Sequence, residues 1–376
     1  MLEKGVFKAP RDGAISSKIL GHRCAMLWRL GEGTALPKRP LAIILGDINR
    51  DLFIHVPAFP KPSRDNPAEA ATWALGGSAF NAATALVKLQ VPTGIIGRIG
   101  KDHEGQAILR EMSKTGIHTG AVQKDPERPT GICIIPITPD GDRTLIGARG
   151  ANQALEPQGI PEAVQGCRHL HVSGYSLVEP RPRQAAREAL RAARAAGATT
   201  SIDFTWHAAV AAPEAIREAL SDVTAALPSA PELRMALGIR KLSLAAQEAI
   251  KLGAEQVAAT LGAGGCRIFV DGKSIRVPPF ETRVVNTCGA GDAFNAGYIF
   301  GLVSGAKPLV CAVLGNAAGA AAVTSEQPAL TLDRAGMAKI LQTGRGITRK
   351  KILNEAIGEA EELLAKSSPR KRRRKR

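Results

Sequence analysis

The stretch Asn286-Thr287-Cys288-Gly289-Ala290-Gly291-Asp292 is the most informative part of this 376-residue chain. It follows a short apolar segment, 283–285, that predicts a strand, and it leads into the small-residue segment 293–302, which predicts a helix. Gly289, Ala290 and Gly291 have little or no side chain. Their backbone N–H groups can therefore surround an anion at a helix N-terminus, where unpaired donors and the helix dipole favour negative charge.

Asp292 is unexpected beside an anion pocket, because its carboxylate repels a negatively charged ligand. The arrangement makes sense if Asp292 takes a proton from a group that attacks the anion. Phosphoryl transfer to a hydroxyl needs this pair, N–H donors for the phosphoryl charge and a base for the incoming alcohol. The alternative is an ordinary Gly-rich turn between a strand and a helix, in which Asp292 only interacts with the helix dipole.

Composition indicates a globular α/β protein of one large or two ordinary domains, because 44% of the residues are hydrophobic. Aromatic residues make up only 4%, which gives no stacking platform for single-stranded nucleic acid. Of the net charge of +16, residues 370–376 supply seven and residues 1–40 five, which leaves +4 for the body between them. The C-terminal run is either a solvated end or a polyanion-binding or nuclear-localisation tail.

The six cysteines form no C-x-x-C pair and no zinc-like cluster with histidines, which predicts reduced thiols in a cytoplasmic protein. Cys288 is either a reactive thiol near a helix N-terminus or a small filler beside the loop, and we favour the filler. His169 and His171 alternate on an expected strand and are interpreted as structural. No secretory signal opens the chain, and no stretch approaches the roughly 20 apolar residues of a membrane-spanning helix.

Strands alternate with helices along most of the chain, which predicts right-handed βαβ units and a parallel sheet. The expected strands are 41–45, 52–56, 93–99, 169–172, 199–203, 223–227 and 256–261, with hairpins at 131–146 and 266–277. The expected helices are 76–89, 104–115, 183–196, 213–220, one ending at 237, 243–252, 289–303, 308–324 and 350–366. Strand 52–56 and the first hairpin are expected to form a small separate sheet.

Six motifs in this order resemble the ribokinase or PfkB-like carbohydrate kinase family, over roughly residues 41–345. They are NTCGAGDAF at 286–294, LGGSAFNAA at 75–83, the G-x-x-G-x-D-x-x-G pattern at 97–105, the first-strand segment 46–51, the nucleotide loop 260–265 and the adenine-side helix at 316–318. The resemblance implies an α/β three-layer sandwich with a central, mostly parallel sheet and a small β-sheet lid. An exposed face on such a lid often pairs with a second subunit, so a homodimer is expected.

The implied organisation has five parts. They are an N-terminal extension at 1–40, a kinase domain at 41–345, a lid within it from about 48–75 and 130–148, a C-terminal helix at 346–369 and a basic tail at 370–376.

The resemblance also implies the site. Asp292 is the catalytic base, and Gly289, Ala290 and Gly291 form the anion hole. The acceptor sugar is assigned to Asn49, Asp51, Gly76, Gly77 and Asn81, because carboxylates and amides bind adjacent hydroxyls and paired glycines let a polyol approach the backbone. ATP is assigned to Ser229, Thr260, Gly262, Gly265 and Asn316. The structural alternatives are a helix-start role for Asn81, a lid-strand charge for Asp51 and turn or helix packing for the nucleotide positions.

Two positions depart from the family pattern. The segment Ser229-Ala230-Pro231-Glu232 stands where the family has Asn-x-x-Glu, and Ser-x-x-Glu is also a helix capping box. We expect Glu232 to contact Mg²⁺ through water. Asn286 replaces the commoner aspartate near a bound K⁺, and because its amide oxygen carries no charge, we expect a weak K⁺ site and weak activation.

Together these features predict an ATP- and Mg²⁺-dependent kinase acting on an alcohol, a hydroxymethyl group, of a small sugar or sugar acid. The first alternative is a nucleoside kinase, which needs an apolar slot for its base, and the lid offers few aromatics beyond Phe53, Phe59 and Trp73. The second is a non-catalytic member associated with nucleic acid, against which the intact loop 289–292 argues. The chain contains no P-loop motif and no dinucleotide-binding glycine pattern.

Overall fold

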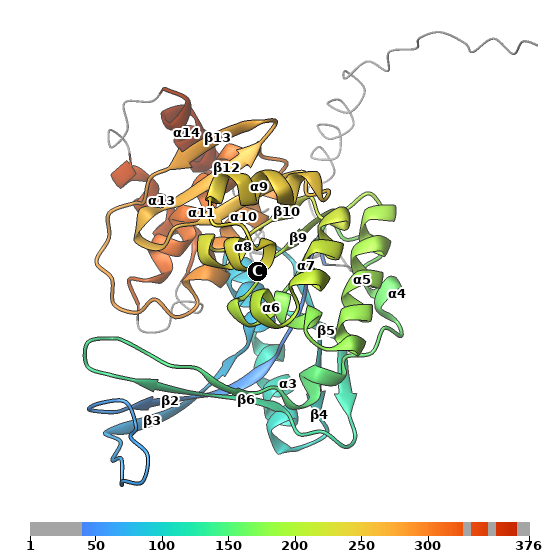
Figure 1. Ribbon diagram of the computed structural model, residues 1–376, viewed down its shortest axis with the longest axis vertical. Coiled ribbons are helices and arrows are strands. Elements are labelled where there is room, and N and C mark those ends of the chain that lie inside the picture. The colour runs from blue at the N-terminus through green and yellow to red at the C-terminus, as the bar shows by residue number, and fades with distance from the viewer. Residues whose placement is uncertain (1–39, 326–331, 345–350, 367–376) are drawn as a thin grey trace, which may run out of the picture. The chain divides into compact units, whose positions relative to one another are not determined.

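The computed structural model describes residues 40–325, 332–344 and 351–366. Within these ranges, a nine-stranded sheet has the order β13-β12-β11-β10-β9-β8-β1-β4-β5, and a four-stranded sheet has the order β3-β2-β6-β7 (Figure 1). The expected central sheet with a smaller β-sheet lid is therefore confirmed. The N-terminal extension and the basic tail lie outside the described residues.

The large sheet is parallel except for one hairpin at its edge. The parallel strands are β1 (Ala42–Leu45), β4 (Thr93–Gly100), β5 (His118–Asp125), β8 (His169–Val172), β9 (Thr199–Ile202), β10 (Ala225–Ala226) and β11 (Gln256–Thr260). β12 (Cys266–Val270) and β13 (Lys273–Val277) form the antiparallel hairpin. The chain order reverses between β1 and β8, and open α/β sheets bind ligands at the carboxyl ends of strands beside such a reversal.

Helices cover both faces of this sheet, which explains why β1 is completely buried. One face carries α2 (Ser78–Lys88), α3 (His103–Thr115), α10 (Ala290–Val303), α11 (Pro308–Ala322), α13 (Arg334–Gly344) and α14 (Lys351–Ala365). The other carries α4 (Ile160–Ala163), α5 (Pro180–Ala195), α6 (Trp206–Ala211), α7 (Pro213–Ala219), α8 (Ala230–Leu237) and α9 (Leu242–Lys251).

Helices α10 and α11 pack unusually closely. A Cβ atom built on Gly297 would lie 2.5 Å from the backbone oxygen of Leu314, so only glycine fits at this crossing. Most residues of both helices are buried, as expected for helices that are apolar on every side. α10, which begins at the predicted anion loop, is therefore held firmly in the core.

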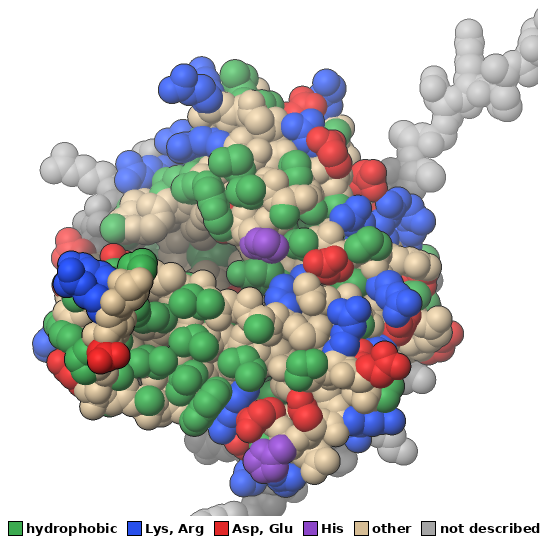
Figure 2. Space-filling model, turned by 60° about the horizontal axis from the view of Figure 1, so that its bottom comes forward, with side chains coloured by type: hydrophobic (Ala, Val, Ile, Leu, Met, Phe, Trp, Pro, Cys, Tyr) green, Lys and Arg blue, Asp and Glu red, His purple; other side chains and the backbone are tan. Residues whose placement is uncertain are grey.

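The lid consists of β2 (Asn49–His55), β3 (Ala70–Gly76), β6 (Gly131–Ile137) and β7 (Ile146–Ala148). Asp51 pairs with Cys133, so both side chains are on the inner face. The outer face carries the row Trp73, Leu52, Ile134 and Ile146, one residue from each strand. Figure 2 shows hydrophobic side chains gathered over the lower left of the surface, where the lid strands lie.

The prediction of a strand at 283–285 is wrong. This segment is irregular, with Val284 59% and Val285 45% exposed. Instead of joining a sheet, the N–H groups of Val285 and Asn286 both donate to the backbone oxygen of Val323 at the end of α11. Two apolar residues, Val284 and Val285, are too few to specify a strand when a helix end offers the hydrogen bonds.

Other elements were not expected from the sequence. β3 and β5 are poor in alternating apolar residues, and α13 follows a region of low periodicity.

α14 packs on α11 and α13 within the same hydrophobic core as α2. Among the described residues, none of the helices is both long and apolar enough to cross a membrane.

Candidate active site

The predicted anion loop lies at the N-terminus of α10. Gly289 is the residue before the helix and has φ of 78°, a left-handed conformation that favours glycine. A Cβ atom at Gly289 or Gly291 would meet nothing within 4 Å, so the small residues leave open space in front of the backbone. The Asn286 side-chain oxygen accepts from the Cys288 N–H at 2.8 Å and shapes the turn that precedes the helix.

Asp292 lies in the first turn of this helix and is half-buried. The Asn81 side-chain nitrogen, at the start of α2, donates to its carboxylate at 2.9 Å. Burial raises the pKa of Asp292 to about 7, the Asn81 hydrogen bond opposes that rise, and the negative charge of Asp51 adds to it. A carboxyl group with such a pKa can accept a proton near neutral pH. The structure thus places Asn81 directly on the proposed base, which the sequence did not reveal.

Asp51 faces the site from the lid. Its side chain is buried, one carboxylate oxygen has no hydrogen-bond partner, and burial raises its pKa to about 7. An unpaired buried carboxylate oxygen is costly, and a hydroxyl group of a ligand would satisfy it. This geometry supports the assignment of Asp51 to an acceptor.

The two glycines at the start of α2 are required by close packing. A Cβ atom on Gly76 would lie 1.8 Å from a carboxylate oxygen of Asp51, and one on Gly77 would lie 2.4 Å from the backbone oxygen of Asp47. At both positions the Cβ direction is occupied by protein atoms, and the assignment of these glycines to the acceptor stays a prediction. These glycines allow the lid and the β1–β2 turn to approach α2, and they position Asp51 indirectly.

The β1–β2 turn is held by residues that sequence reasoning missed. The side chain of Asn152 accepts from the Ile48 N–H and donates to the Asn49 side-chain oxygen, both at 2.9 Å. Arg149 makes a bidentate ion pair with Asp47, with distances of 2.7 and 2.8 Å. These contacts orient Asn49, whose amide nitrogen can still donate to a ligand.

Asp203, also missed, is a buried carboxyl group at the end of β9. It accepts from the Gly174 N–H at 2.7 Å and from the Asn295 side chain at 3.4 Å. Burial raises its pKa to about 8, and the charges of Asp292 and Glu232 add to the rise. No motif pointed to this residue, because a single aspartate at a strand end is common.

The two strand histidines are structural, as predicted. His169 and His171 both contact the Ser201 hydroxyl, at 2.8 and 2.7 Å, and burial lowers the pKa of each. They are therefore neutral core residues.

The predicted nucleotide-binding residues lie together around the end of β11 and the β12–β13 hairpin. Ser229 forms an isolated bridge with Thr260, and the Asn316 amide donates to the backbone oxygens of Val277 and Pro278 at 3.2 and 3.0 Å. A Cβ atom on Gly265 would lie 2.4 Å from that same Val277 oxygen, whereas one on Gly262 would meet nothing. The structure thus brings these residues together, with Gly262 open and Gly265 tightly packed.

Ser229 and Glu232 form the capping box that the sequence suggested. The Ser229 N–H donates to Glu232 at 2.7 Å, and the Ser229 hydroxyl accepts from the Glu232 N–H at 3.4 Å. Across the described ranges no group of three or more His, Cys, Asp and Glu side chains is arranged to hold a metal. Glu232, whose carboxylate also closes the capping box, is the kind of oxygen donor that contacts a hydrated Mg²⁺ ion through water.

The G-x-x-G-x-D-x-x-G motif connects the lid to the body. Asp102 caps α3 and accepts from both the N–H and the hydroxyl of Thr130, at 2.7 and 2.6 Å. Thr130 immediately precedes β6, so this motif anchors one lid strand.

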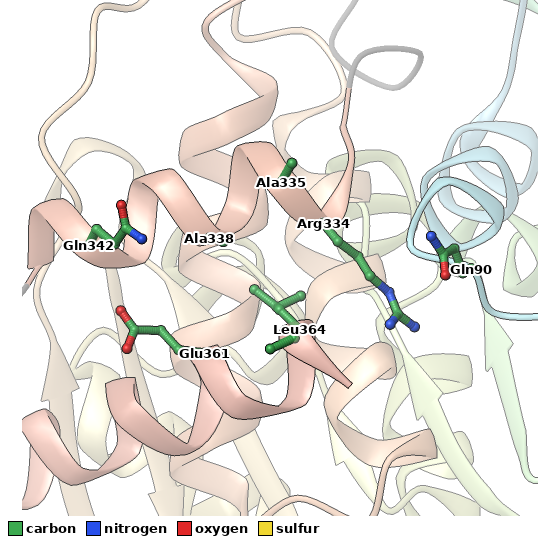
Figure 3. Close-up of a pocket in the computed structure, with 8 residues that line it drawn as sticks. Gln90, Arg334, Ala335, Ala338, Gln342, Glu361 and Leu364 are labelled. Atoms are coloured by element: carbon green, nitrogen blue, oxygen red, sulfur yellow. The ribbon is translucent and has the colours of Figure 1, made fainter. Parts of the chain in front are cut away.

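A separate cavity of about 640 Å³ lies between α13 and α14 (Figure 3). It is lined by Gln90, Arg334, Gln342 and Glu361 above an apolar floor and includes none of the predicted site residues. This cavity is therefore not the candidate active site, which consists of the residues around Asp292 and Asp51.

Comparison with known proteins identifies the family of this chain. The chain matches the pfkB carbohydrate kinase family over residues 39–335. It is 30% identical over 259 residues to an ATP-dependent ribose-1-phosphate kinase of Halopiger xanaduensis, covering 68% of this chain and 82% of that protein. It is 28% identical over 264 residues to an aminoimidazole riboside kinase of Salmonella typhimurium, covering 67% and 82%.

Solved structures show the same fold. The ribokinase of Arabidopsis thaliana complexed with ribose and ATP superposes with a TM-score of 0.70 and 25% identity, covering 80% of this chain and 98% of that one. An adenosine kinase of Sinorhizobium meliloti superposes with a TM-score of 0.70 and 23% identity, covering 79% and 98%. This chain therefore belongs to the pfkB family of carbohydrate kinases and is a phosphotransferase.

Proposed function

We propose that the protein transfers the γ-phosphoryl group of ATP to a hydroxymethyl group of a small sugar or sugar acid. The observation that carries this proposal is the position of Asp292, which directly follows the open Gly289–Gly291 loop and lies near enough to Asp51, a lid residue with an unpaired carboxylate oxygen, for the Asp51 charge to raise its pKa. A base, an anion site and a hydroxyl-binding group are what phosphoryl transfer to an alcohol requires.

In this mechanism Asp51 and Asn49 bind hydroxyl groups of the acceptor and orient the reacting one toward Asp292. Asp292 accepts the proton of that hydroxyl as its oxygen attacks the γ-phosphorus, and ADP leaves. The N–H groups of the first turn of α10 stabilise the charge of the transferred phosphoryl group. The lid limits hydrolysis of ATP by excluding water from the closed site.

ATP is proposed to lie along the loop 260–265 and the middle of α11, near Thr260, Gly262, Gly265, Ser229 and Asn316. The Arabidopsis ribokinase solved with ribose and ATP supports ATP as the phosphoryl donor. Mg²⁺, contacted through water by Glu232, would neutralise phosphate charge when bound. Asn286 is proposed as a weak K⁺ site.

A nucleoside is the second candidate acceptor. Tyr175 and His207 stack with ring centroids 6.2 Å apart, and burial together with the charges of Asp47, Asp203 and Asp292 raises the pKa of Tyr175 to about 12. This aromatic pair therefore lies beside the acceptor side of the site and could contact a base. The similarity to an aminoimidazole riboside kinase agrees with this candidate.

We also propose a homodimer through the outer face of the lid. Trp73 and Ile146 are 50% and 56% exposed on that face, and an exposed apolar sheet surface typically marks an interaction site. Trp73→Lys should convert a dimer into a monomer in sedimentation experiments. A monomeric wild-type chain would contradict the proposal.

The deciding experiment measures ADP release with ribose, other sugars, sugar acids and nucleosides, each with Asp292→Asn as control. The proposal expects at least one acceptor with turnover far above the variant. The kinase assignment fails if none exceeds it.

A further inference from the structure

The cavity between α13 and α14 is large enough to hold a small molecule. Its volume is about 640 Å³, and ligand sites typically enclose about 300–1,000 Å³. Figure 3 shows the Arg334 guanidinium extending toward Gln90 at one end of the cavity, and the side chains of Gln342 and Glu361 at the other end. The lining between these ends is apolar and consists of Ala335, Ala338, Leu364 and Ala365.

Arg334 is a half-buried cation without an anionic partner. Its Nε and Nη1 groups donate to the backbone oxygens of Leu89 and Lys366, both at 2.7 Å, and its guanidinium lies over the Phe300 ring at 5.1 Å. Within the described ranges it forms no ion pair with a carboxylate, and its Nη2 group makes no hydrogen bond. Burial lowers the pKa of Arg334, so the folded protein stabilises this charge less well than water does. A carboxylate supplied by a ligand would compensate it.

The cavity is separate from the proposed active site. Leu89 and Gln90 directly follow α2, whereas Asn81, which contacts Asp292, lies in the first turn of that helix. At 1.5 Å per residue, the helix from Asn81 to Leu89 spans roughly 12 Å. A molecule in the cavity therefore contacts a different part of the protein from the acceptor and the anion loop.

The lining matches a ligand with one negative charge and an apolar body. Among the described residues that line the cavity, Arg334 is the only cation, and the opposite end adds the carboxylate of Glu361. A ligand with two negative charges would leave one of them uncompensated, whereas a carboxylate carries one charge and can accept parallel hydrogen bonds. The apolar lining favours hydrocarbon, because its burial removes apolar surface from water.

We propose that this cavity is a second ligand site, which binds a small organic monocarboxylate. The ligand carboxylate accepts hydrogen bonds from Arg334, and its hydrocarbon body lies along Ala338 and Leu364. The site goes beyond the proposed kinase function and does not depend on it.

Calorimetric titration of the full chain, without nucleotide or acceptor, tests the site with hexanoate as the probe. Hexanoate should bind with a Kd of about 1 mM or tighter. Hexanamide, which has nearly the same shape without the charge, should bind at least about tenfold more weakly. Equal binding of hexanoate and hexanamide, or tighter binding of inorganic phosphate or succinate, overturns the monocarboxylate assignment.

Two variants test whether hexanoate binds in this cavity. Arg334→Gln removes the charge, and Ala338→Leu fills the cavity while it leaves Arg334 in place, so each should weaken hexanoate binding at least about tenfold. The matched controls are Arg110→Gln, at an exposed arginine of α3, and Lys339→Leu, at an exposed residue that adjoins Ala338 but does not line the cavity. Both controls should bind hexanoate as the wild type does.

Ala338→Leu is the deciding variant, because Arg334→Gln also removes hydrogen bonds that hold the ends of α2 and α14. Unchanged hexanoate affinity in Ala338→Leu, with a melting temperature close to that of the wild type, overturns the proposal. Asp292→Asn, which is expected to lose phosphoryl transfer, should bind hexanoate normally. Failure of the kinase function and failure of this site are therefore distinguishable.

Discussion

The Asn81 side chain donates a hydrogen bond to the Asp292 carboxylate at 2.9 Å and joins the first turns of α2 and α10 across 211 residues of sequence. Because α2 begins directly after lid strand β3, the orientation of Asp292 depends on the element at the base of the lid. The two signature motifs of the chain are thus physically connected at the proposed base.

Asp292→Asn should abolish most phosphoryl transfer. An amide of nearly the same shape cannot accept the proton, so kcat should fall by about 10²- to 10⁴-fold, the usual contribution of a general base. Steady-state kinetics with the acceptor from the panel measures the loss. A variant with kcat within a few-fold of the wild type would remove Asp292 from the mechanism.

The rate should depend on ionisation of Asp292. Since the carboxylate form is the base and its pKa is about 7, kcat/KM should rise with pH and level off above that value. Asn81→Ala removes a hydrogen bond that lowers this pKa, so the acid limb should move to higher pH. Ser78→Ala, which alters the neighbouring hydroxyl bonded to Ser173, is the control and should leave the limb in place. An unmoved limb in Asn81→Ala would contradict the predicted coupling.

Asp51→Asn should stabilise the protein at alkaline pH. The pKa of Asp51 is about 7 in the folded state against 3.8 for the free group, so the ionised carboxylate destabilises the folded state. This penalty is absent below about pH 4, grows as the pH rises toward the folded pKa, and is constant above it. Urea unfolding at pH 5 and pH 8.5 should show a larger gain for Asp51→Asn at the higher pH. The same variant should raise KM for the acceptor.

Monovalent cations should have a small effect on the rate. The Asn286 oxygen is uncharged and already accepts from the Cys288 N–H, so it attracts K⁺ weakly. Asn286→Asp should increase the activation of turnover by KCl over that by tetramethylammonium chloride. Strong, saturable activation of the wild type by K⁺ would contradict this prediction.

The sequence predicted the parts of the fold that rest on local pattern. Strand β8 and helix α3 carry clear periodicity, and the open glycines of the loop 289–291 have a recognisable spacing. Strand β3 was not predictable because its sequence, AATWALG, gains its hydrogen bonds from β2 and shows little alternation. Segment 283–285 was misassigned because its hydrogen-bond partner is Val323, which is distant in sequence.

Sequence motifs indicated candidate residues of the site but not the contacts between them. Motifs selected Asp292, Asp51 and Asn81 as candidates, but the contact of Asn81 with Asp292 and the fit of Asp51 against Gly76 cannot be read from spacing. Asp203 lies in a segment without a distinctive pattern. Its proximity to Asp292 arises only from sheet order.

The division of the site between the lid and α10 has a consequence for engineering. Asn49 and Asp51 come from lid strands, whereas Asp292 and the loop come from a helix that Gly297 holds against α11. Under the proposed function, acceptor preference and phosphoryl transfer therefore rest on separable parts of the chain. A chimera that receives the lid strands of a relative, with Gly76, Gly77 and the Asp102–Thr130 anchor retained, should acquire the donor protein's choice of acceptor.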